Sequence, residues 1–362
     1  MKWSWKIATV AGIDVYIHTT FLILIAWIAL AYWQLAGTLL AVVSGVSFIL
    51  ALFFCVLLHE FGHALTARKF NIRTRNITLL PIGGIASIEK IPEDPREEII
   101  IALAGPAVSF AIALLLWLLL TASDGLVSLE DLSITGGSFL QRLMLINILL
   151  AAFNLLPALP LDGGRVFRAL MALWMEPVKA TRIAAGVAQA LAVVLALLGF
   201  RYNLFLVFIA VFIWIGAATE ASMASVKSTL SGVTAKRAML TDFQVLEPHE
   251  SLARAVELTL SGSQKDFPVV SDERVTGVLR QSDLLRGLHD HGKLCRVDQV
   301  MQHDVPSINV SETLENVMER MQIKDRGLLI ATENGHIAGI IDIDNIMELL
   351  RIQKALQEQR NA

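Results

Sequence analysis

Residues 52–65 read LFFCVLLHEFGHAL, and they end an uncharged, apolar run that begins near Thr38. A run of about 20 such residues is typical of a helix that crosses a lipid bilayer. His59, Glu60 and His63 therefore lie at the end of a predicted membrane helix. Ionisable side chains at membrane depth are costly unless they act together, so this placement indicates a functional site.

The spacing of the two histidines predicts a zinc site. Positions i and i+4 share one face of a helix, so the imidazoles of His59 and His63 can bind one ion. Glu60 stands beside the first histidine, where its carboxylate can take a proton from a water molecule activated by zinc. The alternative is a chance match in an ordinary helix, which the membrane placement makes the weaker interpretation.

A catalytic zinc ion needs a third protein ligand. The metzincin extension is excluded, because it requires glycine and histidine where this chain has Thr66 and Lys69. The best candidate is Asp162, in the segment 154–165 that reads NLLPALPLDGGR. Its two prolines interrupt an apolar run, and irregular backbone at membrane depth is tolerated only inside the protein or beside a wet cavity. The alternative is that Asp162 caps a helix in solvent.

The composition divides the chain in two. Of 362 residues, 55% are hydrophobic and only 17% are charged, whereas soluble domains are about a quarter charged. The excess lies in 1–225, which we expect to be a six-span helical membrane domain, and 227–362 resembles ordinary soluble protein. A cleavable signal peptide is not expected, and neither the net charge of -3 nor any basic face favours nucleic acid as a partner. The expected spans are 18–36, 38–66, 97–121, 138–158, 181–200 and 203–223.

Lysine and arginine are unevenly distributed among the connecting segments. They gather in 67–96, in 159–180 and after the sixth span, whereas 34–37 and 122–137 have none. The positive-inside rule therefore places both termini and the two long loops in the cytosol of a multi-pass cell-membrane protein. His59, His63 and Asp162 then lie at the same end of their spans, as a shared zinc ion requires.

The polar half contains an internal repeat. At a constant offset of 62, five residues recur, and a fixed offset indicates two copies of one unit packed on each other. They are Met239/Met301, Asp242/Asp304, Leu252/Leu314, Glu257/Glu319 and Gly277/Gly339. Each copy predicts a short helix, a strand, a helix (252–262 and 314–324), two strands and a final helix (282–289 and 344–351). We expect a linker over 226–233, copies over 234–292 and 293–351, and a polar tail, 352–362, that extends the last helix.

These motifs together resemble the site-2 protease family of intramembrane zinc metalloproteases, in its branch with six spans and C-terminal CBS domains. The matching stretches are His59–Ala64, Pro81–Ala86, Gly105–Ala107 and Asn154–Gly164. The resemblance implies an endopeptidase that cleaves single-span membrane proteins within or near the bilayer. It implies one zinc ion held by His59, His63 and Asp162, with Glu60 as general base and Asn154 holding the substrate or its oxyanion.

Two of these stretches suggest contacts with substrate. The amide of Asn154 is an uncharged donor that can stabilise a tetrahedral intermediate, or alternatively bond backbone carbonyls freed around Pro157. Gly83 and Gly84 lie in an apolar, strand-forming segment too short to span the membrane. We expect either a strand that pairs with an extended substrate or an interfacial loop, and glycine would let a substrate backbone approach closely.

The repeats resemble a CBS domain pair, a module that often binds adenine nucleotides. In copy one, Gly277-Val-Leu-Arg-Gln-Ser-Asp283 makes Asp283 a candidate for a ribose hydroxyl, although Arg280 replaces the usual hydroxyl residue. Copy two departs at both diagnostic positions. The alternative is a module for homodimerisation or substrate docking. CBS pairs also follow channels and transporters, the main alternative class, but those proteins need no zinc motif; a proteolytically silent scaffold and a CAAX-type protease are further alternatives.

Overall fold

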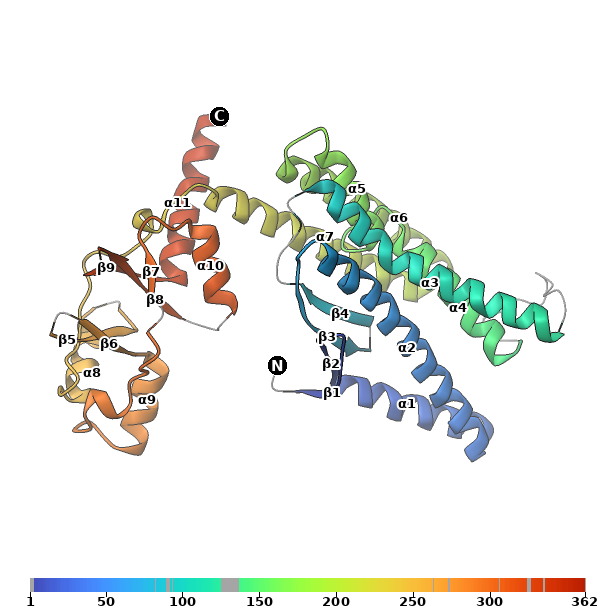
Figure 1. The fold of residues 1–362 in the computed structure, drawn as a ribbon, viewed down its shortest axis with the longest axis horizontal. Helices are drawn as coiled ribbons and strands as arrows, with labels where there is room; N and C mark the ends of the chain where they lie inside the picture. Colours follow the sequence, from blue (N-terminus) through green and yellow to red (C-terminus); the bar gives the residue numbers. More distant parts are fainter. Residues whose placement is uncertain are drawn as a thin grey trace. The chain divides into compact units, whose positions relative to one another are not determined.

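The computed structural model describes residues 3–81, 83–88, 92, 94–124, 137–262, 264–272, 274–305, 307–323, 327–334 and 336–361. The chain divides into two compact units, Met1–Ser222 and Met223–Ala362 (Figure 1). Most of the expected loop 122–137 lies outside the described residues.

The first unit is built from apolar helices. Among the described residues, five helices are long and apolar enough to cross a membrane, and many of their large apolar side chains, such as Leu197 and Phe208, are more than half exposed. Lipid is the solvent that such a surface requires, so the chain is a multi-pass membrane protein. The helices are α1 (Thr19–Ala36), α2 (Leu39–Lys69), α3 (Pro95–Asp124), α4 (Phe139–Asn154), α5 (Asp162–Ala172), α6 (Pro177–Tyr202) and α7 (Leu204–Leu230).

Helix α4 differs from the expected fourth span. It has 16 residues and ends at Asn154, whereas the sequence predicted a helix over 138–158. Sixteen residues extend roughly 24 Å, less than the ~30 Å hydrocarbon core of a bilayer. The helix ends early because Leu156 precedes Pro157, and a residue before proline disfavours helical dihedral angles.

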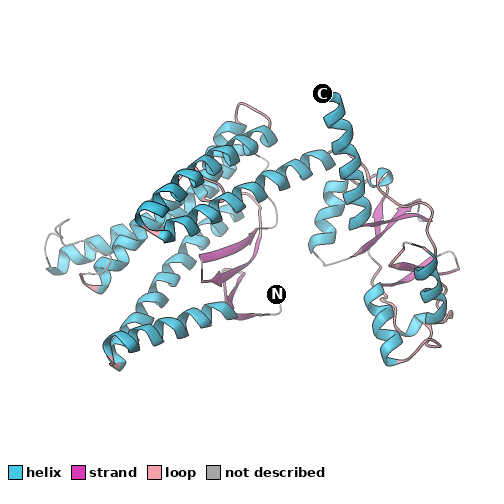
Figure 2. Ribbon diagram, turned by 180° about the vertical axis from the view of Figure 1, so that it is seen from behind, coloured by secondary structure: helices cyan, strands magenta, loops and turns pink. Residues whose placement is uncertain are grey.

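The first unit also contains a four-stranded sheet, drawn in magenta beside its helices in Figure 2. Its order is β1-β2-β3-β4, with β2 and β3 parallel and the other neighbours antiparallel. Ile13, Val15 and Ile77 are buried against Phe61 and Ala64 of α2, which fixes the sheet beside the helix that carries the histidines. The strands are β1 (Ser4–Val10), β2 (Ile13–His18), β3 (Thr74–Leu80) and β4 (Gly83–Ile88). Within the described part of the chain, strand β4 bonds to β3 and forms one edge of the sheet.

The second unit contains the two expected repeats. Helices α8 and α10 begin at Leu252 and Leu314, which are 62 residues apart. Copy one contains α8 (Leu252–Ser261), β5 (Phe267–Ser271), β6 (Arg274–Leu279) and α9 (Gln281–Asp290). Copy two contains β7 (Ser307–Asn309), α10 (Leu314–Ile323), β8 (Leu328–Glu333), β9 (His336–Asp342) and α11 (Ile343–Asn361). Near its start each copy has a short 3₁₀ helix, Ala235–Arg237 or Val297–Gln299.

The two copies are joined by backbone bonds. Leu240 pairs with Ile340, and Val278 pairs with Gln302. The expected linker 226–233 is helical in its first part, because α7 continues to Leu230. Leu230 is buried in the core of copy two, with Val226 packed beside it, which holds this end of α7 in the second unit.

Candidate metal centre

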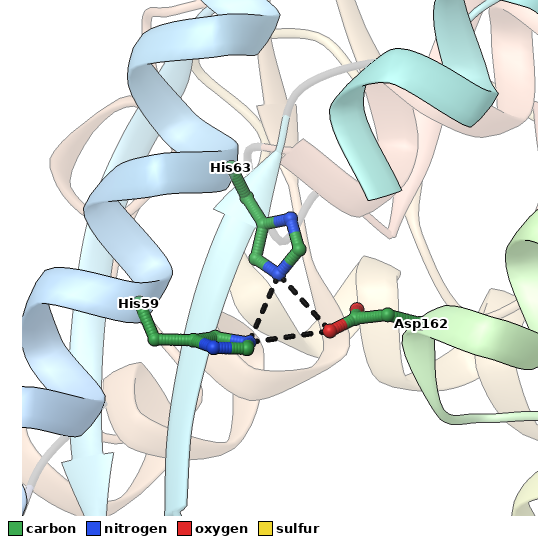
Figure 3. Close-up of side chains that lie close together, drawn as sticks. All are labelled: His59, His63 and Asp162. Atoms are coloured by element: carbon green, nitrogen blue, oxygen red, sulfur yellow. Dashed lines mark hydrogen bonds and ion pairs between the residues drawn. The ribbon is translucent and has the colours of Figure 1, made fainter. Parts of the chain in front are cut away.

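Three side chains converge where α2 meets the start of α5. His59 and His63 project from α2 toward Asp162, the first residue of α5 (Figure 3). The two histidine Nε2 atoms are 3.2 Å apart, and each lies 3.2 Å from Asp162 Oδ2. Ligand atoms about 2.0–2.1 Å from a tetrahedral zinc ion are roughly 3.3 Å from one another, so this triangle has the size that zinc requires.

Both imidazoles are oriented by α3. His63 Nδ1 lies 2.7 Å from the carbonyl oxygen of Ile101, and His59 Nδ1 lies 3.0 Å from Ser109 Oγ. A backbone carbonyl only accepts hydrogen bonds, so His63 must carry its proton on Nδ1 and present an electron pair at Nε2. Ser109 can accept the corresponding proton of His59. Such partners fix the orientation and tautomer of metal-binding histidines.

The donor set fits a metal cation better than a proton. His63 Nε2 and the carboxylate oxygen of Asp162 both accept hydrogen bonds, so at 3.2 Å a proton or a cation must lie between them. His59 Nε2 is a third atom at the same distance. One proton bridges two atoms, whereas one zinc ion binds all three. His59 and His63 are only 4% and 8% exposed, which excludes bulk water from much of the cluster.

Gly105 of α3 leaves space for the two imidazoles, because it has no side chain. A Cβ atom at this position would lie 2.1 Å from His63 Nε2 and 2.6 Å from His59 Nε2. Ile101, Gly105 and Ser109 are four residues apart, so they line one face of α3. Gly105 belongs to one of the stretches that match the family, but its sequence context did not predict this role, nor the roles of Ile101 and Ser109.

The glycines after Asp162 explain how that residue reaches α2. An added Cβ would lie 2.2 Å from the Leu155 carbonyl oxygen at Gly163, and 2.3 Å from the Leu159 nitrogen at Gly164. Only glycine permits the first turn of α5 to press against the segment after α4. This close packing turns the chain back and directs Asp162 toward the two histidines.

The other candidate residues occupy different surroundings. The half-buried Glu60 lies against β4, because a Cβ on Gly84 would be 2.6 Å from Glu60 Cγ. Asn154 ends α4 and is half-buried, and its side chain has no hydrogen bond to a described residue.

In the second unit, Asp283 is 8% exposed, and its Oδ2 accepts a hydrogen bond from Gln302 Nε2 at 2.7 Å. The carboxylate is therefore covered by a neighbour from the segment that precedes β7. A ribose hydroxyl bound to this carboxylate would share it with Gln302 or replace Gln302.

The sequence comparisons identify the family. The profile of Peptidase family M50 matches residues 47–136 and 130–199, and the CBS domain profile matches residues 235–290 and 297–352. A zinc metalloprotease of Methanocaldococcus jannaschii is 30% identical over 363 residues, which covers 99% of this chain and 100% of that protein. The chain belongs to peptidase family M50. The predicted metalloprotease family and CBS domain pair are thus confirmed.

Two further relatives are similar to parts of this M50 peptidase. Stage IV sporulation protein FB of Bacillus subtilis is 30% identical over 158 residues, covering 43% of this chain and 49% of that protein. The solved structure of a site-2 protease from Methanocaldococcus jannaschii is 34% identical in sequence, with a TM-score of 0.46. The match covers 60% of this chain and 95% of the chain in that structure.

Proposed function

We propose that this M50 peptidase is an intramembrane zinc endopeptidase that cleaves single-span membrane proteins within or near the bilayer. The observation that carries the proposal is the convergence of His59, His63 and Asp162, with their ligand atoms 3.2 Å apart. These atoms lie among helices long enough to span a membrane. We assign one zinc ion per chain to this cluster.

Each residue around the cluster has a distinct role in the proposed hydrolysis. A bound zinc ion supplies Lewis acidity to the attacking water and to the scissile carbonyl. Glu60 accepts the proton of that water and then delivers it to the leaving amine, as one carboxylate can do in succession. The Asn154 amide donates a hydrogen bond to the carbonyl oxygen as negative charge develops on it. His59 and His63 keep their Nδ1 protons on α3, so their Nε2 electron pairs remain available.

Strand β4 is suited to present the substrate. It is an edge strand, and its backbone at Gly84 lies against the side chain of Glu60. A substrate segment that pairs with the free edge of β4 would be held in an extended conformation close to the general base. This arrangement explains why a substrate helix must unwind, because a helix shields its amide bonds from attack. Gly83 and Gly84 keep the strand free of side chains that would hold the substrate away.

The topology and the second unit complete the proposal. The distribution of Lys and Arg supports a cytosolic location for both termini and for the CBS pair. We assign this pair a regulatory role, through an adenine nucleotide at Asp283 or through homodimerisation. In copy one, Gln302 competes with a nucleotide for the Asp283 carboxylate, because its amide already donates to Oδ2.

The proposal is tested by zinc content and cleavage together. The purified protein in detergent should contain about one zinc ion per chain, and it should cleave some members of a panel of single-span membrane proteins. Glu60→Gln should retain zinc and lose cleavage. Glu176→Gln is the matched control, because Glu176 is an exposed glutamate whose ion pair is with Lys179 at the start of α6. Zinc-free wild-type protein under zinc-replete conditions would refute the metal assignment, and cleavage by Glu60→Gln would refute the general base.

A further inference from the structure

A buried ion pair joins α5 to α3. Glu98 of α3 and Arg168 of α5 have side chains only 12% and 14% exposed. Arg168 Nε donates to Glu98 Oε1 at 3.0 Å, and Arg168 Nη2 donates to the same oxygen. Arg168 lies on the helix that begins with Asp162, six residues after this third member of the metal cluster.

Through this pair, helix α3 helps to position all three members of the cluster. Helix α3 already orients His63 through the Ile101 carbonyl and His59 through Ser109. Glu98 is three residues before Ile101 and therefore on a neighbouring part of the same helix. Because α5 has only 11 residues, a contact on its second turn fixes the direction of its first residue.

Stability alone is a weak reason for such a pair. Removing two charges from water costs about as much as their attraction returns, so buried ion pairs are often no more stabilising than apolar contacts. What a two-bond arginine–carboxylate contact supplies is geometry. The site that needs geometry here is the triangle of ligand atoms with its sides of 3.2 Å.

We propose that Glu98 is a positioning residue of the zinc site, which acts through Arg168 to hold α5 so that Asp162 reaches the two histidines. The proposal rests on the function proposed above, because it requires zinc at this cluster. It assigns to α3 the placement of the third ligand as well as of the first two.

The test is a double-mutant cycle on zinc affinity, measured in the full-length protein by competition with a chelator of known affinity. Glu98→Gln should weaken zinc binding about 10–100-fold, the range typical when a partner of a metal ligand is lost. In an Asp162→Ala background, which retains His59 and His63, the same substitution should have no further effect. Glu97→Gln is the matched control, because Glu97 is the adjacent glutamate and makes no ion pair with a described residue.

Arg168→Lys provides a second variant that keeps the positive charge and loses the planar fork. It should fold, as judged by its circular dichroism, and should also bind zinc more weakly than the wild type. Unchanged zinc affinity in both Glu98→Gln and Arg168→Lys would overturn the proposal. An equal loss with and without Asp162 would also overturn it, because Glu98 would then act by another route. Wild-type protein that binds no zinc would overturn the proposed function as well.

Discussion

The closest contact around the metal cluster makes Gly105→Ala the most informative single substitution. The added methyl group would lie 2.1 Å from His63 Nε2 and 2.6 Å from His59 Nε2. Ordinary van der Waals contact begins at about 3.4 Å, so His63 would have to withdraw by about 1.3 Å. Its imidazole cannot withdraw freely, because Nδ1 is hydrogen-bonded to the carbonyl oxygen of Ile101, which lies on α3 as Gly105 does.

The consequence for zinc is large because metal sites tolerate little displacement. Ligand distances in a working site stay within about 0.2 Å of their ideal values. A shift of about 1 Å in a catalytic group commonly costs about 100-fold in rate. We therefore expect Gly105→Ala to reduce zinc affinity and cleavage by about 100-fold or more. Its effect on folding should be modest, since the better helix propensity of alanine, about 1 kcal/mol, offsets part of an overpacking cost of about 1–3 kcal/mol.

The assay compares Gly105→Ala with Gly186→Ala. Gly186 lies within α6, and a Cβ there would meet no described atom within 4 Å beyond its chain neighbours and the adjoining helix backbone. Both proteins should show the same helical circular dichroism and similar melting temperatures. Only Gly105→Ala should lose zinc, measured by chelator competition, and cleavage of a membrane substrate. Full zinc content and activity in Gly105→Ala would refute the reasoning, because they would show that the imidazoles do not occupy the position described.

Three further predictions follow from other contacts. Ser109→Ala should weaken zinc binding about 10–100-fold in chelator competition, because His59 loses the partner of its Nδ1; unaltered affinity would count against that role. Burial raises the pKa of Asp266 in the second unit. The folded unit therefore holds this proton more tightly than the unfolded chain, so stability should fall as pH rises from about 3.9 through the folded pKa. Hydrogen exchange of the second unit across this pH range should show that dependence, and Asp266→Asn should reduce it. Gln302→Ala should bind AMP more tightly than the wild type in calorimetric titration, because it uncovers Asp283; equal or weaker binding would contradict this.

Much of the architecture could be predicted because its signals are local or periodic. Apolar runs mark the membrane helices, and the constant offset of 62 marks the two copies of the second unit. Residue chemistry marks the metal cluster, since few side chains bind zinc and histidines at i and i+4 meet on one face. Asp162 could be proposed because prolines and glycines interrupt an apolar run around it. The structure brings all three side chains together.

Other features depend on contacts between distant segments, and their local signals are weak. Strands β1 and β2 have six or seven residues each, and the alternation of Ile13, Val15 and Ile17 is too short to indicate a sheet by itself. The pairing of β2 with β3 links segments about 60 residues apart. The end of α4 at Asn154 was placed too late, because an apolar run alone does not show where a proline will stop a helix.

The residues of α3 that control the site were missed for a different reason. A metal ligand must be one of a few residue types, but the partner of a histidine Nδ1 can be any carbonyl or hydroxyl. Ile101 serves through its backbone, so its side chain carries no information about that role. Gly105 serves by lacking a side chain, and Ser109 is one of many serines. These roles exist only once α3 lies against α2, and the same packing allows α3 to orient the two histidines through contacts on one face.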